Sequence, residues 1–160
     1  DTATTDISTL SLHDALPISV CLGNDGFSFA MWDEWRTCYL AHKLHKKDPR
    51  AMPGDLVATM GAINNGKMAS NFFKDKIGAI EVGAKADLIL VDYKPITEMT
   101  AGNLPWHIIF GFRDSMVTHT IVDGKVLMRD KEVLGVNEEE ISKRAKEISR
   151  EVWKRYERQF

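Results

Sequence analysis

Residues 64–93 have the sequence NNGKMASNFFKDKIGAIEVGAKADLILVDY, and their pattern changes halfway along. The first part, Asn64–Phe73, predicts a short helix. Glycines follow at positions 78 and 83, and the apolar residues Leu88–Val91 then predict a strand. The stretch therefore divides a helix-rich part of the chain from a strand-rich part.

Further helices are predicted on the N-terminal side of this boundary. Ser28–His45 contains no proline and carries large side chains at helical spacing: Trp32, Trp35, Tyr39 and His42. Asp48–Pro49 ends this helix, because the residue before a proline avoids the helical region. Pro53–Met60 predicts a second helix with its proline in the first turn. Ahead of both, the apolar run Val20–Leu22, bounded by glycine, predicts a buried strand.

The C-terminal side predicts a hairpin and a final helix. Residues alternate on either side of Asp123–Gly124, a strong signal for a two-residue hairpin turn, and residues 131–135 (KEVLG) offer one further short strand. Asn137–Gln159 predicts a helix, because Asn137 is a good N-cap and Glu140 completes a cap-box-like start. An apolar stripe follows this helix: Ile141, Ala145, Ile148, Val152 and Tyr156.

Composition limits the possible functions. The chain has 160 residues, which suits one ordinary domain or the tail of a larger one. Its formal net charge of −2 gives no basic field for nucleic acid, and no apolar run approaches the roughly 20 residues of a membrane-spanning helix. Cys21 and Cys38 are isolated, which predicts free thiols and a reducing, cytoplasmic compartment. The expected partner is a small-molecule substrate, with neither nucleic acid nor membrane, and homo-oligomer formation is left open.

The first 19 residues, DTATTDISTLSLHDALPIS, differ from the rest. A common sequencing-adapter text, translated in frame, gives TLSLHDALPI, which is identical to Thr9–Ile18. The segment has neither the basic start nor the sustained apolar core of a signal peptide. We expect residues 1–19 to be a non-native addition; the alternative is an ordinary disordered N-terminus. His13 and Asp14 are therefore not treated as half of a catalytic pair.

Three stretches together resemble the C-terminal part of the amidohydrolase superfamily, the metal-dependent (β/α)8 hydrolases. The first is LGNDG (22–26), which is followed by a helix. The second is residues 64–93, which are similar to the family pattern N-G-A…A…I-G-x-I-x-x-G-x-x-A-D-L-x-x-x-D. The third is THTIVDGKVLMRD (118–130), which is similar to the family's closing V-x-V-x-G-x-x-V hairpin. Within the superfamily, DPRAMP (48–53), LVDYKPITEMTAGN (90–103) and FGFRDSMV (110–117) resemble the aminohydrolase group called SsnA more than cytosine or guanine deaminases. The resemblance covers nearly all of residues 20–160.

The resemblance implies a catalytic role for Asp25. In the family an aspartate ends the eighth barrel strand and projects into the active site, and the matching position here is Asp25. Nearby glycines permit a sharp turn, although the family more often has threonine where Asn24 stands. The implied cofactor is a divalent metal, with zinc expected, which lowers the pKa of a bound water toward about 7. Asp25 would ligate this metal, take up a proton and pass it to a leaving nitrogen.

The family's other metal ligands are not found in this sequence. No H-x-H pair occurs, and one carboxylate cannot hold a catalytic zinc, which usually has three protein ligands. We therefore expect a fragment with an α/β plus β fold: the C-terminal end of a (β/α)8 barrel, the C-terminal half of a small composite β-sandwich and a terminal helix. The expected divisions are 1–19, 20–75 for the last barrel strand and closing helices, 76–136 for the sandwich strands and 137–160 for the amphipathic helix.

The implied function is the C-terminal part of an aminohydrolase that hydrolyses a non-peptide carbon–nitrogen bond in a cyclic amidine or N-heterocycle. The fragment alone is expected to be inactive, and its substrate-binding residues are unknown. The alternative is a non-catalytic relative in which the same barrel serves assembly. For Asp25 itself, the alternative role is a plain turn residue or helix cap.

Structural roles are favoured for the other chemistry-bearing residues. His42 and His45 share a helix face, but no third metal ligand is spaced nearby. Cys38 is expected to be a buried thiol and not a nucleophile. Trp32 is expected in the core, with the edge of the pocket as its alternative. Turn, strand-end or partly exposed positions are expected for Asp87, Asp92, His107 and His119.

Overall fold

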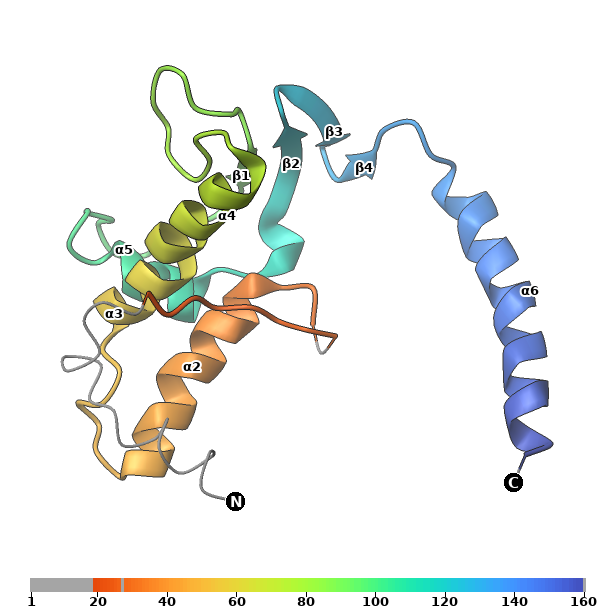
Figure 1. The fold of residues 1–160 in the computed structure, drawn as a ribbon, viewed down its shortest axis with the longest axis horizontal. Helices are drawn as coiled ribbons and strands as arrows, with labels where there is room; N and C mark the ends of the chain where they lie inside the picture. Colours follow the sequence, from red (N-terminus) through yellow and green to blue (C-terminus); the bar gives the residue numbers. More distant parts are fainter. Residues whose placement is uncertain (1–18, 27, 160) are drawn as a thin grey trace.

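The computed structural model describes residues 19–26 and 28–159, so the adapter-like segment lies outside the described residues except for its last member, Ser19. The order of elements is the expected one: helices, then an antiparallel sheet, then a final helix (Figure 1). None of the helices within the described ranges is both long enough and apolar enough to cross a bilayer.

The helical part begins with α2, Met31–Lys46, which confirms the first predicted helix. A longer helical run follows, made of α3 (Gly54–Ala58), the π-helix η1 (Thr59–Asn64) and α4 (Asn65–Phe73). Two separate helices were predicted here, and the structure joins them. No proline stands between Met60 and Asn64, and Gly61 costs a helix only about 1 kcal/mol, so the helical hydrogen bonding continues and the joint widens into a π-helix.

The sheet has four antiparallel strands in the order β1-β2-β3-β4. They are β1 (Leu88–Val91), β2 (Val117–Val122), β3 (Lys125–Arg129) and β4 (Glu132–Val133). The strands predicted at Leu88–Val91 and within residues 131–135, and the hairpin, are confirmed. Asp123 and Gly124 both have positive φ, 49° and 76°, as a type I′ turn requires, and this turn matches the twist of the flanking strands.

Three short helices connect β1 to β2, and they were not predicted from the sequence. They are α5 (Leu104–Trp106), the π-helix η2 (His107–Gly111) and η3 (Asp114–Met116). Gly111 of η2 lies against the ring of Tyr93, so closely that a Cβ at position 111 would stand 2.5 Å from the tyrosine oxygen. A glycine is therefore required where the connection folds back onto the end of β1.

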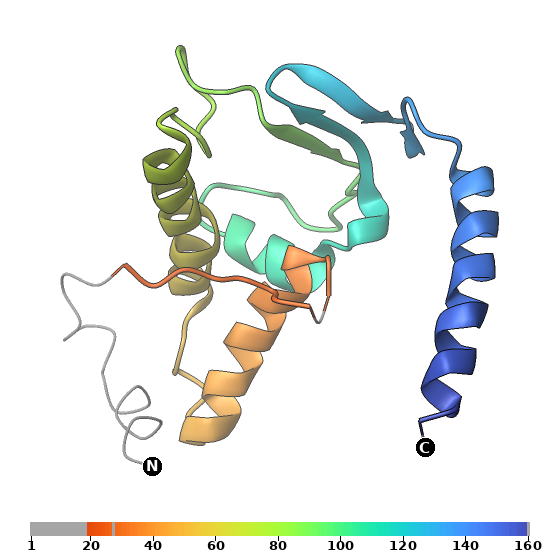
Figure 2. The same cartoon turned by 45° about the vertical axis from the view of Figure 1, so that its right-hand side comes forward.

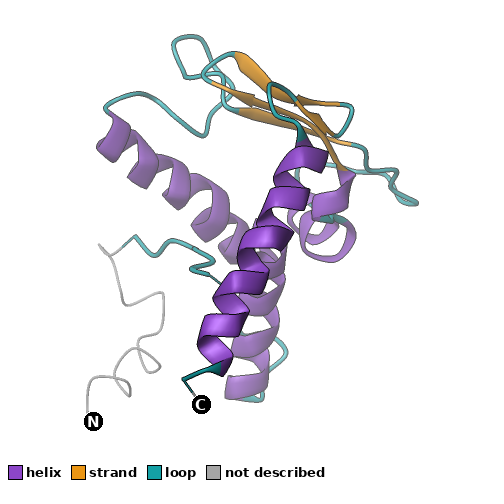
Figure 3. Ribbon diagram, turned by 90° about the vertical axis from the view of Figure 1, so that its right-hand side faces the viewer, coloured by secondary structure: helices purple, strands orange, loops and turns teal. Residues whose placement is uncertain are grey.

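The buried core lies in the helical part and joins residues from α2, the loop before α3, α3, η1 and η2. Its members are Trp35, Met52, Val57, Met60 and Ile109, with Val57 and Ile109 fully enclosed. The helices that supply them lie beside one another, and the sheet lies at one end of this group (Figures 2 and 3). Core burial therefore ties η2, which belongs to the strand-rich part of the chain, to α2 and α3.

The last helix, α6, spans Glu138–Glu157 and begins as predicted. The Asn137 side chain accepts a hydrogen bond from the Glu140 amide at 3.1 Å, which satisfies one of the free N–H groups of the first turn. The helix stands apart from the other elements (Figures 1 and 2). Its apolar stripe is consequently exposed, with Ile141 and Ile148 at 55% and 54%.

The predicted strand at Val20–Leu22 is wrong for this structure. Residues 19–24 belong to no strand or helix, and the segment passes the helices as an open stretch (Figure 1). A strand exists only by pairing, and no described strand pairs with this one. The Val20 and Leu22 side chains still pack against the core, so their predicted burial is met in part.

In the described residues, then, the fold is a mixed helical and antiparallel-sheet structure. The membership of residues 20–75 in a (β/α)8 barrel, the C-terminal half of a β-sandwich and the divisions at residues 20, 76 and 137 stay predictions.

Candidate functional site

Asp25 lies in the turn between the open segment and α2. Its φ of 49° is in the left-handed region, which aspartate and asparagine adopt more readily than most residues. The residue is exposed, and among the described residues no hydrogen bond or ion pair engages its carboxylate. The predicted site residue therefore presents an uncommitted carboxylate on a sharply bent backbone.

The turn is closed on the side of α2 by polar contacts. The Asn24 side-chain amide donates to the Ser28 carbonyl, and the Ser28 hydroxyl accepts a hydrogen bond from the Ala30 amide at 3.0 Å. Asn24, for which the sequence suggested no role, thus spans the turn that carries Asp25.

Two further asparagines hold the segment on the other side of the turn. The Asn65 carboxamide accepts a hydrogen bond from the Leu22 N–H at 3.0 Å and donates one to the Leu22 carbonyl at 2.8 Å. Asn64 donates to the Val20 carbonyl at 2.8 Å. Sequence analysis missed these contacts, although the NNG at the start of the 64–93 stretch was a signal that could have pointed to them.

The rest of the 64–93 stretch fixes the position of these asparagines. Gly66 and Gly78 approach so closely that a Cβ on Gly78 would stand 2.9 Å from the Gly66 Cα. The Ser70 hydroxyl donates to the Gly66 carbonyl at 2.8 Å and accepts from the Ile77 amide at 3.0 Å. The chain after α4 is therefore clamped onto the first turn of that helix, next to Asn65.

The described residues do not complete a metal site. Among them, no three histidine, cysteine, aspartate or glutamate side chains gather around a common point. Because a catalytic zinc usually takes three protein ligands, Asp25 can supply only one of the set. At this turn the described residues therefore offer a single exposed carboxylate.

The two other candidate metal or nucleophile positions are unsuited to those roles. Burial lowers the pKa of His42, and the neighbouring His45 and Lys46 lower it further, but no cluster of ligands forms around this pair in the described part of the chain. Burial raises the pKa of the Cys38 thiol, which makes it a poorer nucleophile at neutral pH. Cys21 and Cys38 are both free thiols, as predicted.

The remaining candidates have structural partners. Asp87, directly before β1, accepts a hydrogen bond from the Asp123 amide at 2.7 Å, which confirms its strand-end role. His119 lies beside the Thr118 hydroxyl at 3.0 Å and 3.8 Å from Asp130. Trp32 packs edge-on against Trp35 and Phe112, with ring centroids 6.3 and 5.3 Å apart.

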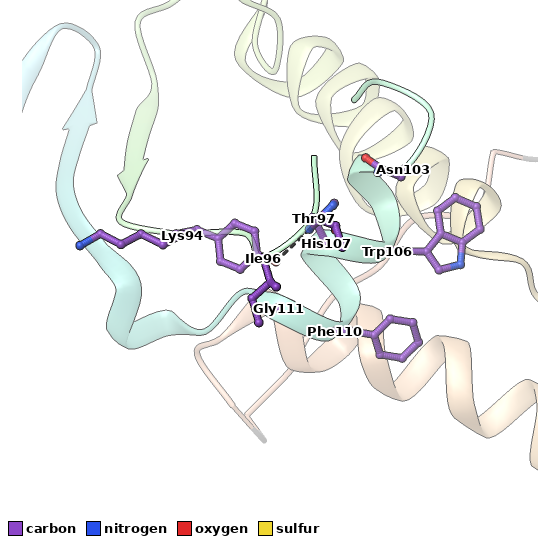
Figure 4. A pocket seen from close by; sticks show the side chains of 9 residues that line it. Lys94, Ile96, Thr97, Asn103, Trp106, His107, Phe110 and Gly111 are labelled. Atoms are coloured by element: carbon purple, nitrogen blue, oxygen red, sulfur yellow. Dashed lines mark hydrogen bonds between the residues drawn. The ribbon is translucent and has the colours of Figure 1, made fainter. Parts of the chain in front are cut away.

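An open pocket of about 480 Å³ lies between the loop after β1 and the α5–η2 connection (Figure 4). In it the Tyr93 hydroxyl and the His107 Nδ1 are hydrogen-bonded at 2.8 Å. Asp25 is not among the lining residues, which include Lys94, Trp106 and Phe110. The pocket and the candidate catalytic carboxylate are therefore separate features of this chain.

Comparison with known proteins identifies the fold family. The amidohydrolase family is matched over residues 5–127, which is more than half of the chain. The chain belongs to the amidohydrolase family. The predicted resemblance is thus confirmed. The match starts within residues 1–19, whose expected non-native origin stays a prediction.

Curated amidohydrolase relatives include deaminases. A 5′-deoxyadenosine deaminase of Methanosarcina barkeri is 34% identical over 139 residues, which are 84% of this chain and 31% of the relative. A 5-methylthioadenosine/S-adenosylhomocysteine deaminase of Syntrophobacter fumaroxidans is 30% identical over the same shares. The chain spans about a third of the length of these relatives. Assignment to the SsnA group stays a prediction.

Solved amidohydrolase structures share the fold. An adenosine deaminase from Xanthomonas campestris with bound zinc superposes with a TM-score of 0.64 at 22% identity, over 78% of this chain and 28% of that protein. Atrazine chlorohydrolase TrzN from Arthrobacter aurescens TC1, complexed with zinc, gives 0.54 at 17% identity, over 71% and 25%.

Proposed function

We propose that this chain is the C-terminal part of a metal-dependent aminohydrolase, in which Asp25 is one ligand of the metal and a carrier of the transferred proton. The observation that supports the proposal most is the placement of Asp25. An exposed carboxylate without a described partner lies on a left-handed turn directly before α2, inside the range matched by the amidohydrolase family.

The proposed cofactor is a divalent metal ion, zinc in the first instance, because the similar solved structures contain bound zinc. When bound, such an ion supplies hydroxide from water at neutral pH. Its other ligands would come from parts of a longer protein, since the described residues offer Asp25 alone. The chain by itself is therefore proposed to be inactive.

The proposed reaction is hydrolytic loss of ammonia from an amino-substituted N-heterocycle. The curated relatives are named for adenosine derivatives, and the amino group of an adenine ring belongs to a cyclic amidine. The oxygen of water bonds to the ring carbon, the carbon–nitrogen bond breaks, and the nitrogen leaves as ammonia. Asp25 takes the proton released by water and returns it to the departing nitrogen, which keeps the step balanced.

The proposed setting is the cytoplasm, with a small-molecule substrate as the partner. The free thiols Cys21 and Cys38 suit a reducing compartment.

The proposal is tested on a longer protein that carries this chain. Ammonia release would be measured with 5′-deoxyadenosine and adenosine. Cytosine and guanine, which also carry an amino group on an N-heterocycle, would serve as comparison compounds. We expect release from the adenosine compounds, bound divalent metal in the longer protein, and no release by the 160-residue chain alone. A longer protein that binds no metal and releases no ammonia from any of the four would support the non-catalytic, assembly-type relative instead.

A further inference from the structure

The asparagines at the start of α4 occupy the place of a neighbouring strand. In an extended chain, the N–H and C=O groups of alternate residues point to the same edge. Val20 and Leu22 are such a pair, and the groups on this edge are met by the carboxamides of Asn64 and Asn65. The Asn65 carboxamide both accepts from and donates to Leu22, as a peptide group of an adjacent strand would.

The two asparagines lie at the joint between η1 and α4 and bond the same open segment. Asn64 is the last residue of η1 and Asn65 is the first of α4, so they are consecutive and would point in well-separated directions on a regular α-helix. Both have regular right-handed helical dihedrals, and each carboxamide accordingly meets a different residue of the open segment, Val20 for Asn64 and Leu22 for Asn65. Asn65 is held further by the Gly66–Gly78 contact beside it.

We propose that Asn65, assisted by Asn64, is a positioning residue for Asp25, an inference that rests on the proposed function. Leu22 lies close before Asp25 in the sequence, and the far side of the turn is closed by Asn24 and Ser28. With Leu22 fixed by two hydrogen bonds, both ends of the turn are anchored. A ligand on a loop must be held by supporting contacts to present its oxygens in one place.

The first test measures the exchange rate of the Leu22 amide hydrogen by NMR in dilute solutions of the 160-residue chain. Asn65→Ala removes both hydrogen bonds, and we expect exchange at Leu22 to become about tenfold faster, as loss of one hydrogen bond of ordinary net strength implies. Asn65→Asp keeps the acceptor for the Leu22 N–H, so we expect a smaller effect. Asn71→Ala is the matched control, because Asn71 is an exposed residue of the same helix. Equal exchange at Leu22 in Asn65→Ala and Asn71→Ala would overturn the proposed clamp.

The second test measures the dissociation constant of the divalent metal in a longer protein that carries this chain. We expect Asn65→Ala to weaken metal binding about tenfold, the lower end of the range for outer contacts of a metal site, and Asn71→Ala to leave it unchanged. Should Asn65→Ala fail to fold, Asn64→Ala is measured in its place, because it removes one hydrogen bond from the same edge. We expect Asn64→Ala to weaken metal binding by a smaller factor.

Asp25→Asn separates this inference from the proposed function. If Asp25→Asn weakens metal binding and Asn65→Ala does not, the positioning role is overturned and the proposed function stands. If Asp25→Asn leaves metal binding unchanged, the proposed function fails, and the role of Asn65 toward the metal fails with it.

Discussion

The indole ring of Trp35 lies directly over Gly61, so that a Cβ at position 61 would stand 2.2 Å from Nε1 of the indole. Trp35 is buried at 4% exposure in α2, and Gly61 belongs to η1, the π-helical joint between α3 and α4. The tryptophan ring is thus seated on the joint itself, and the packing of α2 against the helical run depends on the absence of a side chain at residue 61.

Gly61→Ala should therefore destabilise the fold even though alanine is the better helix former. Overpacking of a filled core costs about 1–3 kcal/mol, more than the roughly 1 kcal/mol that alanine gains over glycine in a helix. The measurement is the melting temperature of a longer protein that carries this chain. Gly102→Ala is the control, because its nearest neighbouring atom would lie 3.9 Å away. A Gly61→Ala melting temperature at or above that of the unchanged protein would show that the indole can move aside freely.

Arg36 should stabilise the contact between α2 and η2 by capping, and only slightly by its ion pair. Its Nε donates to the Ile109 carbonyl at 3.0 Å and its Nη2 to the Phe112 carbonyl at 3.4 Å, while Asp33 at 2.8 Å is exposed. We expect Arg36→Met to cost about 1–3 kcal/mol, since it leaves the Ile109 carbonyl without its side-chain donor, while the Phe112 carbonyl keeps the Arg113 guanidinium at 2.7 Å. Asp33→Asn should cost at most about 1 kcal/mol, the range for surface ion pairs. Equal losses in thermal denaturation for the two variants would assign the effect to the ion pair.

The Cys38 thiol should alkylate slowly, and its alkylation rate should rise only at a higher pH than that of an ordinary thiol. Burial raises its pKa above the ordinary 9.0, so the reactive thiolate forms only at higher pH in the folded chain. Burial of the neutral thiol stabilises the folded state fully below the pKa of Cys38 in the unfolded chain. This stabilisation is lost as the pH rises through the higher pKa of the folded chain. Mass spectrometry of iodoacetamide-treated chain, folded and in urea, gives the rates. A folded-state rate at Cys38 equal to that in urea would contradict the burial argument.

The isolated chain should self-associate through β1. This strand is at the edge of the sheet, and Leu88, Ile89 and Leu90 are 36%, 45% and 51% exposed. Exposed apolar edge strands pair with other chains unless a charge interrupts them. We expect Ile89→Lys to lower light scattering at a given concentration, and Ser142→Lys, which adds the same charge on exposed α6, to change it little. A monodisperse monomer that unfolds in one sharp transition would argue against this expectation.

The features that the sequence predicted well depend on local chemistry. The Asp123–Gly124 turn needs residues that tolerate positive φ, and the start of α6 needs a side chain that accepts from the first turn; both requirements are met by neighbours along the chain. The strand Leu88–Val91 could likewise be predicted, because it is a short continuous apolar run between the polar residues Asp87 and Asp92.

The features that sequence analysis missed depend on contacts between distant residues. Leu22 and Asn65 are 43 positions apart, and no local pattern indicates that a side-chain amide takes the place of a strand. The predicted strand at Val20–Leu22 was wrong because a strand requires a partner, which composition cannot reveal. Asp25 was found through a motif shared with a family, and its left-handed turn agrees with the sharp exit that the nearby glycines suggested.

The central claim concerns Asp25, and the most direct measurement is turnover of Asp25→Asn in a longer protein that carries this chain. Asparagine adopts the left-handed conformation at φ 49° as readily as aspartate, so folding and melting temperature should change little. The substitution removes the charge and the basicity, and general acid–base groups contribute about 10²–10⁴-fold, so ammonia release from the adenosine substrate should fall by at least that factor. The affinity for the metal, measured beside it, should be reduced, because the substitution removes a charged ligand. Near-normal turnover of Asp25→Asn at unchanged melting temperature would contradict the account and leave Asp25 as a turn residue.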